Sequence, residues 1–307
     1  MRLAFHFKDS LVFNSAIMRR AYVSLPILLT SFILFSGFTK PPKPATRPLG
    51  VDSGSTKKTV EKRIQKKTDS VVHAYTELLK YVVPAPDQGE TVTCLFVAST
   101  GAMEILLNKH HKISHPKPFS KYDLSERYTI QMPIGPVYKT WYENVFLGFN
   151  QLGVSVPAVE LPFEAWQDPE KTLINWDVWN YPENFESLTR IELPKVDTEE
   201  LFVRGKKWST HVLENEDIET VKQALLSKRS PVLINYNDDS YWHIILIVGF
   251  DDNKIGDCYG TPAEDCDPKK PGAFYVRDHN GIAIEARSYD WFLTNANAAF
   301  SVFEATH

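Results

Sequence analysis

The sequence predicts an α+β protein in which helices come first along the chain and strands follow. Apolar residues recur at helical spacing through much of the first half, whereas short apolar runs bounded by turn residues occupy the second half. The chain has 307 residues, of which 43% are hydrophobic and 23% charged. This composition is typical of a globular protein with a sizeable core. We therefore expect two lobes, one mainly helical and one rich in strands.

Residues 1–38 predict an export signal. Two arginines in Met18-Arg19-Arg20 precede an apolar run at 21–38, and this run ends in small residues. A positive start followed by an apolar run and small residues is the layout of a secretory signal. Met18 fits the start of such a signal better than Met1 does. The alternative is an uncleaved membrane anchor, for which the polar residues within the run make a weak spanning helix. We expect an exported protein, periplasmic or extracellular, with membrane anchoring as the alternative.

Residues 39–83 precede the main body in this interpretation. Residues 39–55 are rich in Pro, Gly and Ser and predict a linker. Across 56–83 the apolar residues recur at steps of three to four, apart from one longer gap, which predicts an amphipathic helix that packs on the body or acts as a short pro-like segment. Its lysines predict a solvated face, with attraction to an anionic surface as the alternative. Pro84 and Pro86 end this helix, so the body is expected at 84–307.

The body begins with helices. An apolar segment starting at Cys94 predicts a helix to about His110, and a second helix is expected at Asn144–Leu152. An amphipathic helix at Ile218–Leu226 then leads into the strands. The expected strands are the runs at 231–236, 244–250 and 273–277, which are bounded by turns.

The chain has three cysteines, at positions 94, 258 and 266. Export favours disulfides, and Cys258 and Cys266 share one loop containing Gly and Pro, where a local bridge is sterically reasonable. Pairing these two leaves Cys94 as the odd thiol. At a helix N-terminus the unpaired backbone N–H groups and the helix dipole favour a thiolate, so Cys94 is the candidate nucleophile. The alternative is a small buried apolar residue.

A cysteine nucleophile needs a base and a group that orients the base. His243 begins an apolar strand, and Asp278 closes the next one. Asp278 could accept the second ring N–H of His243 and fix its tautomer, as the third member of a triad does. Taken alone, each also has an ordinary interpretation, as a structural histidine and a turn-forming aspartate.

Several motifs in order resemble the papain-like cysteine peptidases, over approximately residues 84–306. They are Gln88-Gly89 before Cys94, the alanine-containing segment Ala98–Glu104, Leu124-Ser125-Glu126, Gly153-Val154, Leu161–Glu164, Ser230–Leu233, His243–Phe250 and Phe274–Gly281. His243 follows Cys94 by 149 residues, which lies within the range for this family. The resemblance implies a papain-like two-lobe fold, with the Cys94 helix in the helical lobe and His243 and Asp278 in the β-rich, barrel-like lobe.

The resemblance also implies peptide hydrolysis through a thioester. Cys94 would attack the scissile carbonyl, His243 would pair with the thiolate and protonate the leaving amine, and Gln88 would donate to the oxyanion. Asp278 stands where the family has asparagine, and Asn280 is the alternative orienting residue. The implied partner is a peptide or protein substrate, with no cofactor, and we expect a monomer.

Two other functions remain open. A bacteriocin-processing type of cysteine peptidase has a similar order of Cys, His and Asp, and a catalytically degenerate relative would bind peptides without cleaving them. The formal net charge of −4 and the sequence pI of about 6.2 provide no global basic field, so no nucleic-acid partner is expected.

No metal site is expected either. His110, His111 and His115 lack a recognisable ligand spacing. The acidic residues around Asp251 and Asp257 lack the full calcium-loop pattern and its closing glutamate.

Overall fold

The computed structural model describes residues 71–89, 93–131, 141–163, 185–203, 213–238, 241–279, 281 and 284–305. The chain divides into two units, Met1–Ile64 and Gln65–His307, and every described residue belongs to the second. The expected signal at 1–38 and linker at 39–55 therefore lie outside the described residues. Within the described ranges, no helix is both long and apolar enough to cross a membrane.

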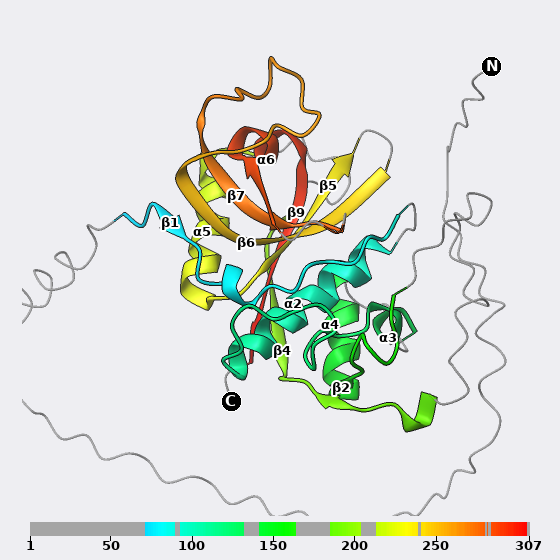
Figure 1. The fold of residues 1–307 in the computed structure, drawn as a ribbon. Helices are drawn as coiled ribbons and strands as arrows, with labels where there is room; N and C mark the ends of the chain where they lie inside the picture. Colours follow the sequence, from blue (N-terminus) through cyan, green and yellow to red (C-terminus); the bar gives the residue numbers. More distant parts are fainter. Residues whose placement is uncertain are drawn as a thin grey trace, which may run out of the picture. The chain divides into compact units, whose positions relative to one another are not determined.

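Three helices form the helical part of the second unit (Figure 1). They are α2 (Cys94–His110), α3 (Glu126–Gln131) and α4 (Trp141–Leu152). The helix α2 is buried from Leu95 to Asn108 because it packs against α3 and α4 and also against the sheet strands β5 and β6. A helix that is apolar on all sides is typical of such a central position.

The strands form an antiparallel sheet in the order β4-β9-β5-β6-β7-β8, with β1 pairing with β6. The strands are β1 (Ala74–Tyr75), β4 (Val196–Val203), β5 (Val232–Asp238), β6 (Tyr241–Ile255), β7 (Pro271–Arg277), β8 (Glu285–Ser288) and β9 (Ala296–Glu304). A separate short pair is made by β2 (Val154–Ser155) and β3 (Ile191–Glu192). The remaining elements are the 3-10 turns η2 (Leu79–Tyr81) and η5 (Phe185–Ser187) and the helices α5 (Asn215–Lys228) and α6 (Tyr289–Asn295).

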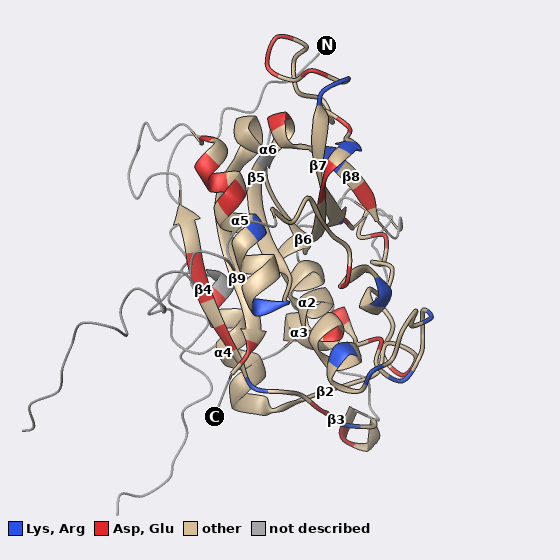
Figure 2. Cartoon of the chain, turned by 90° about the vertical axis from the view of Figure 1, so that its left-hand side faces the viewer, with Lys and Arg blue, Asp and Glu red and all other residues tan. Residues whose placement is uncertain are grey.

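The helix α5 packs on the sheet through its apolar residues, which include Ile218, Val221 and Leu225. Glu214 and Asp217 cap its start reciprocally, which satisfies backbone N–H groups of the first turn. Figure 2 shows Asp and Glu positions gathered along α5 and the neighbouring β4. They are Glu216, Asp217, Glu219, Asp197, Glu199 and Glu200.

The helix expected over 56–83 is wrong for its described part, residues 71–83. There the chain forms β1 and η2 instead. Tyr75 pairs with Phe250 of β6, and the carbonyl of Tyr75 lies against Gly249, where a side chain would overlap it. Backbone pairing with a long strand thus outcompetes local helix formation. The body therefore begins before residue 84.

The predicted α+β class is confirmed, since helices carry Cys94 and antiparallel strands carry His243 and lead to Asp278. The predicted helices correspond to α2, α4 and α5, and the predicted strands to β5, β6 and β7. The sequence patterns did not predict β4, β8, β9 or α6.

Candidate active site

Cys94 is the first residue of α2 and carries a free, half-buried thiol. The carbonyl of Thr93 accepts the backbone N–H groups of Phe96 and Val97 at 2.9 and 3.0 Å, which starts the helix at this point. The thiol therefore stands at the positive end of the helix dipole.

His243 lies near the start of β6, and only 2% of it is exposed. Its Nε2 lies 3.0 Å from Oδ1 of Asp278, which leaves Nδ1 as the ring nitrogen available to Cys94. Burial alone would lower the pKa of His243. Hydrogen bonds to Asp278 and Cys94, together with their charges, outweigh burial and raise the pKa of His243 to about 9.

Asp278 directly follows β7 and has both carboxylate oxygens engaged. Oδ1 accepts from Nε2 of His243 and from the backbone N–H of His279 at 2.7 Å, and Oδ2 accepts from Arg287. Burial opposes ionisation of this carboxyl, but the His243 hydrogen bond and the Arg287 charge hold its pKa well below its usual range. Asp278 is therefore a carboxylate with a fixed orientation.

Arg287 is a member of this site that the sequence patterns did not reveal. It comes from β8, is fully buried, and donates to Tyr236 Oη at 3.2 Å and to Glu285 at 3.3 Å as well as to Asp278. The rings of Tyr259 and Trp291 lie 3.8 and 4.8 Å from its guanidinium. No sequence signal pointed to this role, because the strand that carries Arg287 was not predicted either.

Tyr236 supports the same arrangement from β5. Its position pairs with His243 in the antiparallel register, and its ring meets the His243 ring edge-on at 5.2 Å. Trp291 packs against Tyr236 at 5.0 Å, and its ring also lies over the guanidinium of Arg287. Aromatic rings thus shield the charged network from solvent.

Gln88 is buried beside the segment that follows β7. Its backbone N–H donates to the carbonyl of His279 at 3.1 Å. The Asp87 carboxylate accepts the N–H of Gly89 at 2.8 Å, and Gly89 has a positive φ of 55°, which glycine adopts at little cost. This tight turn places Gln88 next to the residues that carry Asp278.

Arg277 links the three segments that contribute to the site. Its guanidinium donates to the carbonyl of Val83 at 2.8 Å, to the carbonyl of Val97 at 3.1 Å and to Glu104 at 3.1 Å. Position 101 lacks a side chain, and a Cβ there would overlap this guanidinium. The strand leading to Asp278, the Cys94 helix and the chain before Gln88 are therefore joined through one buried arginine.

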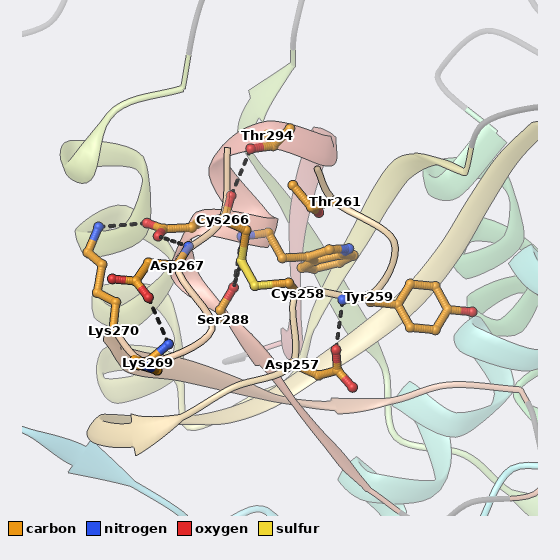
Figure 3. The surroundings of a disulfide bond; sticks show 12 residues. Asp257, Cys258, Tyr259, Thr261, Cys266, Asp267, Lys269, Lys270, Ser288 and Thr294 are labelled. Atoms are coloured by element: carbon orange, nitrogen blue, oxygen red, sulfur yellow. Dashed lines mark hydrogen bonds and ion pairs between the residues drawn. A yellow bond between two sulfur atoms is a disulfide. The ribbon is translucent and has the colours of Figure 1, made fainter. Parts of the chain in front are cut away.

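The remaining predicted positions fall as follows. Asn280 lies outside the described residues. Cys258 and Cys266 form a disulfide, with their Cα atoms 5.9 Å apart (Figure 3).

The histidines and acidic residues considered as metal ligands make other contacts. His110 faces Glu304 at 3.5 Å, His111 stacks on the ring of Tyr122, and His115 donates its backbone N–H to the carbonyl of Lys80. In the acidic segment around Asp251, the Asp251 carboxylate accepts the backbone N–H of Asn253.

One group within the described residues offers ligand atoms at metal-binding spacing. His243, Asp278 and His279 each have one such atom, and these atoms lie within 4.8 Å of one another. However, the Asp278 carboxylate already accepts from Arg287, whose positive charge opposes a cation there. The arrangement therefore fits a hydrogen-bonded network better than a metal centre.

No family model matches the sequence, and a sequence comparison with curated proteins finds no significant match. Solved structures of papain-like cysteine proteases are similar in fold. Bromelain from Ananas comosus, in complex with the E64 inhibitor, has a TM-score of 0.46 and 11% identity over 76% of this chain and 100% of that chain. The recombinant stem bromelain precursor has a TM-score of 0.49 and 10% identity over 77% and 72% of the two chains.

Digestive procathepsin L2 proteinase from the larval midgut of Tenebrio molitor has a TM-score of 0.44 and 14% identity over 77% of this chain and 69% of that chain. At these identities and TM-scores the likeness does not identify a reaction. The roles of individual residues therefore rest on their contacts.

Proposed function

We propose that this protein is a cysteine peptidase that hydrolyses peptide bonds through a thiolate of Cys94 and an imidazolium of His243. The observation that carries the proposal is the position of His243, which interacts with Cys94 on one side and with the Asp278 carboxylate on the other. A nucleophile, a base and an orienting group in contact are the signature of nucleophilic catalysis.

The reaction has two stages. The Cys94 sulfur attacks the scissile carbonyl carbon, His243 gives its proton to the leaving amine, and a thioester forms. Water, deprotonated by His243, then attacks the thioester carbonyl, and the thiolate leaves as the carboxylic acid product is released. Asp278 accepts from Nε2 of His243 throughout and so keeps Nδ1 directed at the reacting atoms.

The tetrahedral intermediates carry a negative oxygen that needs donors. Gln88 and the backbone N–H of Cys94 are the proposed pair. Gln88 is held beside Asp278 and His279 by a backbone hydrogen bond and a tight turn. The Cys94 N–H lies at the start of α2, where the helix dipole also favours negative charge.

The electrostatics of the site support an ion pair at neutral pH. With a pKa of about 9, His243 is protonated at pH 7 and can stabilise the thiolate. The Asp278 carboxylate stays ionised over the same range because its pKa lies well below its usual value. We further propose that the protein is exported, since a disulfide such as Cys258–Cys266 persists in oxidising compartments.

The proposal is tested by peptide-library cleavage with the full chain and its Cys94→Ala variant in parallel. Cleavage by the wild type alone is the expected result, and a Cys94-directed epoxysuccinyl probe should label the wild type only. Equal cleavage by both proteins would refute the assignment.

A degenerate peptide-binding protein would give a different pattern. It would retain peptides on a column without cleaving them, and thiol titration would still show a free Cys94.

A further inference from the structure

The loop Gly256–Cys266 is fastened to the strand that carries Arg287. The N–H of Asp257 donates to the carbonyl of Ala286 at 2.8 Å, and the carbonyl of Asp257 accepts the N–H of Ser288 at 2.9 Å. These bonds flank Arg287 on both sides. Gly256 comes so close to β8 that a Cβ would overlap the backbone of Ser288. The start of the loop therefore has a fixed position relative to Arg287.

The disulfide fixes the other end of the loop. Cys266 is buried, and its Sγ lies 3.1 Å from Oγ of Ser288, which also accepts the N–H of Trp291 at 3.0 Å (Figure 3). The bridge from Cys258 to Cys266 thus closes the loop next to Ser288, where β8 ends and α6 begins. Its closure restricts the residues between the two cysteines.

Tyr259 follows the first cysteine of the bridge and has an unusual backbone. Its φ of 39° lies in the left-handed region, which is unfavourable for a bulky side chain. The Asp257 carboxylate accepts its N–H at 2.9 Å, which stabilises this conformation (Figure 3). The ring then lies 3.8 Å from the guanidinium of Arg287, although the residue is 43% exposed. A strained conformation that is held by surrounding contacts is typical of functional sites.

We propose that Tyr259, held by the disulfide-closed loop, is a positioning residue for the proposed peptidase reaction: it keeps Arg287 in the geometry that directs Asp278 at His243. This inference rests on the proposed function. The rings of Tyr259 and Trp291 both lie over the guanidinium, Tyr236 accepts from Nη1, and Arg287 is fully buried although Tyr259 is partly exposed. Cation–π contact and exclusion of water strengthen the pairing of Arg287 with Asp278.

The consequence is a change in the alkaline limb of the pH profile. The groups that face Asp278 are His243 from β6, His279 in the following turn and Arg287 from β8, with Glu285 sharing Arg287. If Arg287 loosens, Oδ1 of Asp278 is no longer held toward Nε2 of His243, and the hydrogen bond that raises the pKa of His243 weakens. The pKa of His243 then falls toward its ordinary value, and the imidazolium is lost at lower pH.

The experiment compares Tyr259→Asn with Tyr259→Phe in the full chain. Asparagine tolerates a left-handed backbone, so the first variant removes the ring without adding strain, whereas the second keeps the ring face. For Tyr259→Asn we expect the alkaline limb to move to lower pH, so that kcat/KM at pH 9.5 falls by up to about fivefold relative to its value at pH 7, from the size of an ordinary cation–π contact. Tyr259→Phe should follow the wild-type profile.

A second variant tests the disulfide itself. The double substitution Cys258→Ser with Cys266→Ser should shift the alkaline limb in the same direction as Tyr259→Asn. A pH profile of kcat/KM for Tyr259→Asn that superimposes on the wild-type profile would overturn the inference. An equal loss of kcat/KM at both pH values would overturn it as well.

A further readout separates this inference from the proposed function. The rate at which iodoacetamide alkylates Cys94 reports the thiolate and imidazolium pair without any peptide cleavage. If the wild type cleaves no peptide, the proposed function fails, and the alkylation profile of Tyr259→Asn still decides whether the loop positions Asp278. If the wild type is active and Tyr259→Asn leaves both the kcat/KM profile and the alkylation profile unchanged, only the positioning role fails.

Discussion

Replacement of Asp278 by asparagine tests the electrostatics of the site. The substitution keeps an oxygen that can accept from Nε2 of His243 but removes the negative charge. It also leaves Arg287 with Glu285 as its remaining carboxylate partner, so the positive charge of Arg287 acts on His243 with less compensation. Both effects disfavour the imidazolium, so they act in the same direction on the pKa of His243.

The size of the expected effect follows from the shift that the fold causes in the pKa of His243. Its pKa rises from 6.5 to about 9 against the opposing effect of burial, and the raising interactions come from two partners, Asp278 and Cys94. At 1.36 kcal/mol per unit this shift corresponds to about 3 kcal/mol. The charge of one partner then accounts for about one unit of the pKa of His243. The alkaline limb of the kcat/KM profile should therefore move from about pH 9 to about pH 8.

The assay is the pH dependence of kcat/KM on a fluorogenic peptide, because this parameter reports pKa values of the free enzyme. Glu285→Gln is the matched control, since it removes a carboxylate from the same Arg287 without removing a partner of His243. Its alkaline limb should stay at the wild-type position.

Stability must be followed in parallel. Asp278→Asn leaves a buried arginine short of a partner, which costs about 3 kcal/mol. Thermal unfolding identifies the temperature range in which the variant is folded. An alkaline limb that remains near pH 9 in folded Asp278→Asn protein would refute the role given to this carboxylate.

Three further outcomes are expected. Gln88→Ala should lower kcat by about 10²-fold with little change in KM, measured by steady-state kinetics, if its amide binds the oxyanion; an unchanged kcat contradicts that role. Gly101→Ala should destabilise the fold by about 3 kcal/mol in denaturant unfolding, because its Cβ displaces the buried guanidinium of Arg277. The loss of stability caused by Gly101→Ala should vanish when Arg277 is also replaced by Met. If the loss persists in that double variant, overlap with Arg277 is not its cause.

Burial raises the pKa of Glu126 from 4.5 to about 7 despite the Arg277 charge. The stability that protonated Glu126 contributes is therefore fully present below pH 4.5 and is lost as the pH rises through about 7. Glu126→Gln should therefore raise the melting temperature at pH 8 and not at pH 4, and an equal effect at both would argue against this ionisation.

The candidate site illustrates how far sequence patterns reach. Cys94, His243 and Asp278 could be selected because each has a local signal: a thiol opening an apolar helix, a histidine opening an apolar strand and a carboxylate closing one. Gln88 depended on the order of several motifs along the chain. The helix expected at 71–83 failed because β1 obtains backbone partners from β6, which lies about 175 residues further along the chain, beyond the reach of any local periodicity.

The sequence by itself determined the α+β class, the helix that begins at Cys94, the main central strands and the residues proposed for catalysis. These features depend on local periodicity and on spacing. The partners of the buried charges were decided only by the tertiary structure. Antiparallel pairing of β7 with β8 brings Arg287 to Asp278, and the packing of α2 against the sheet brings Arg277 to Glu104. A buried charge requires a partner, but which partner it meets depends on register and packing between distant segments.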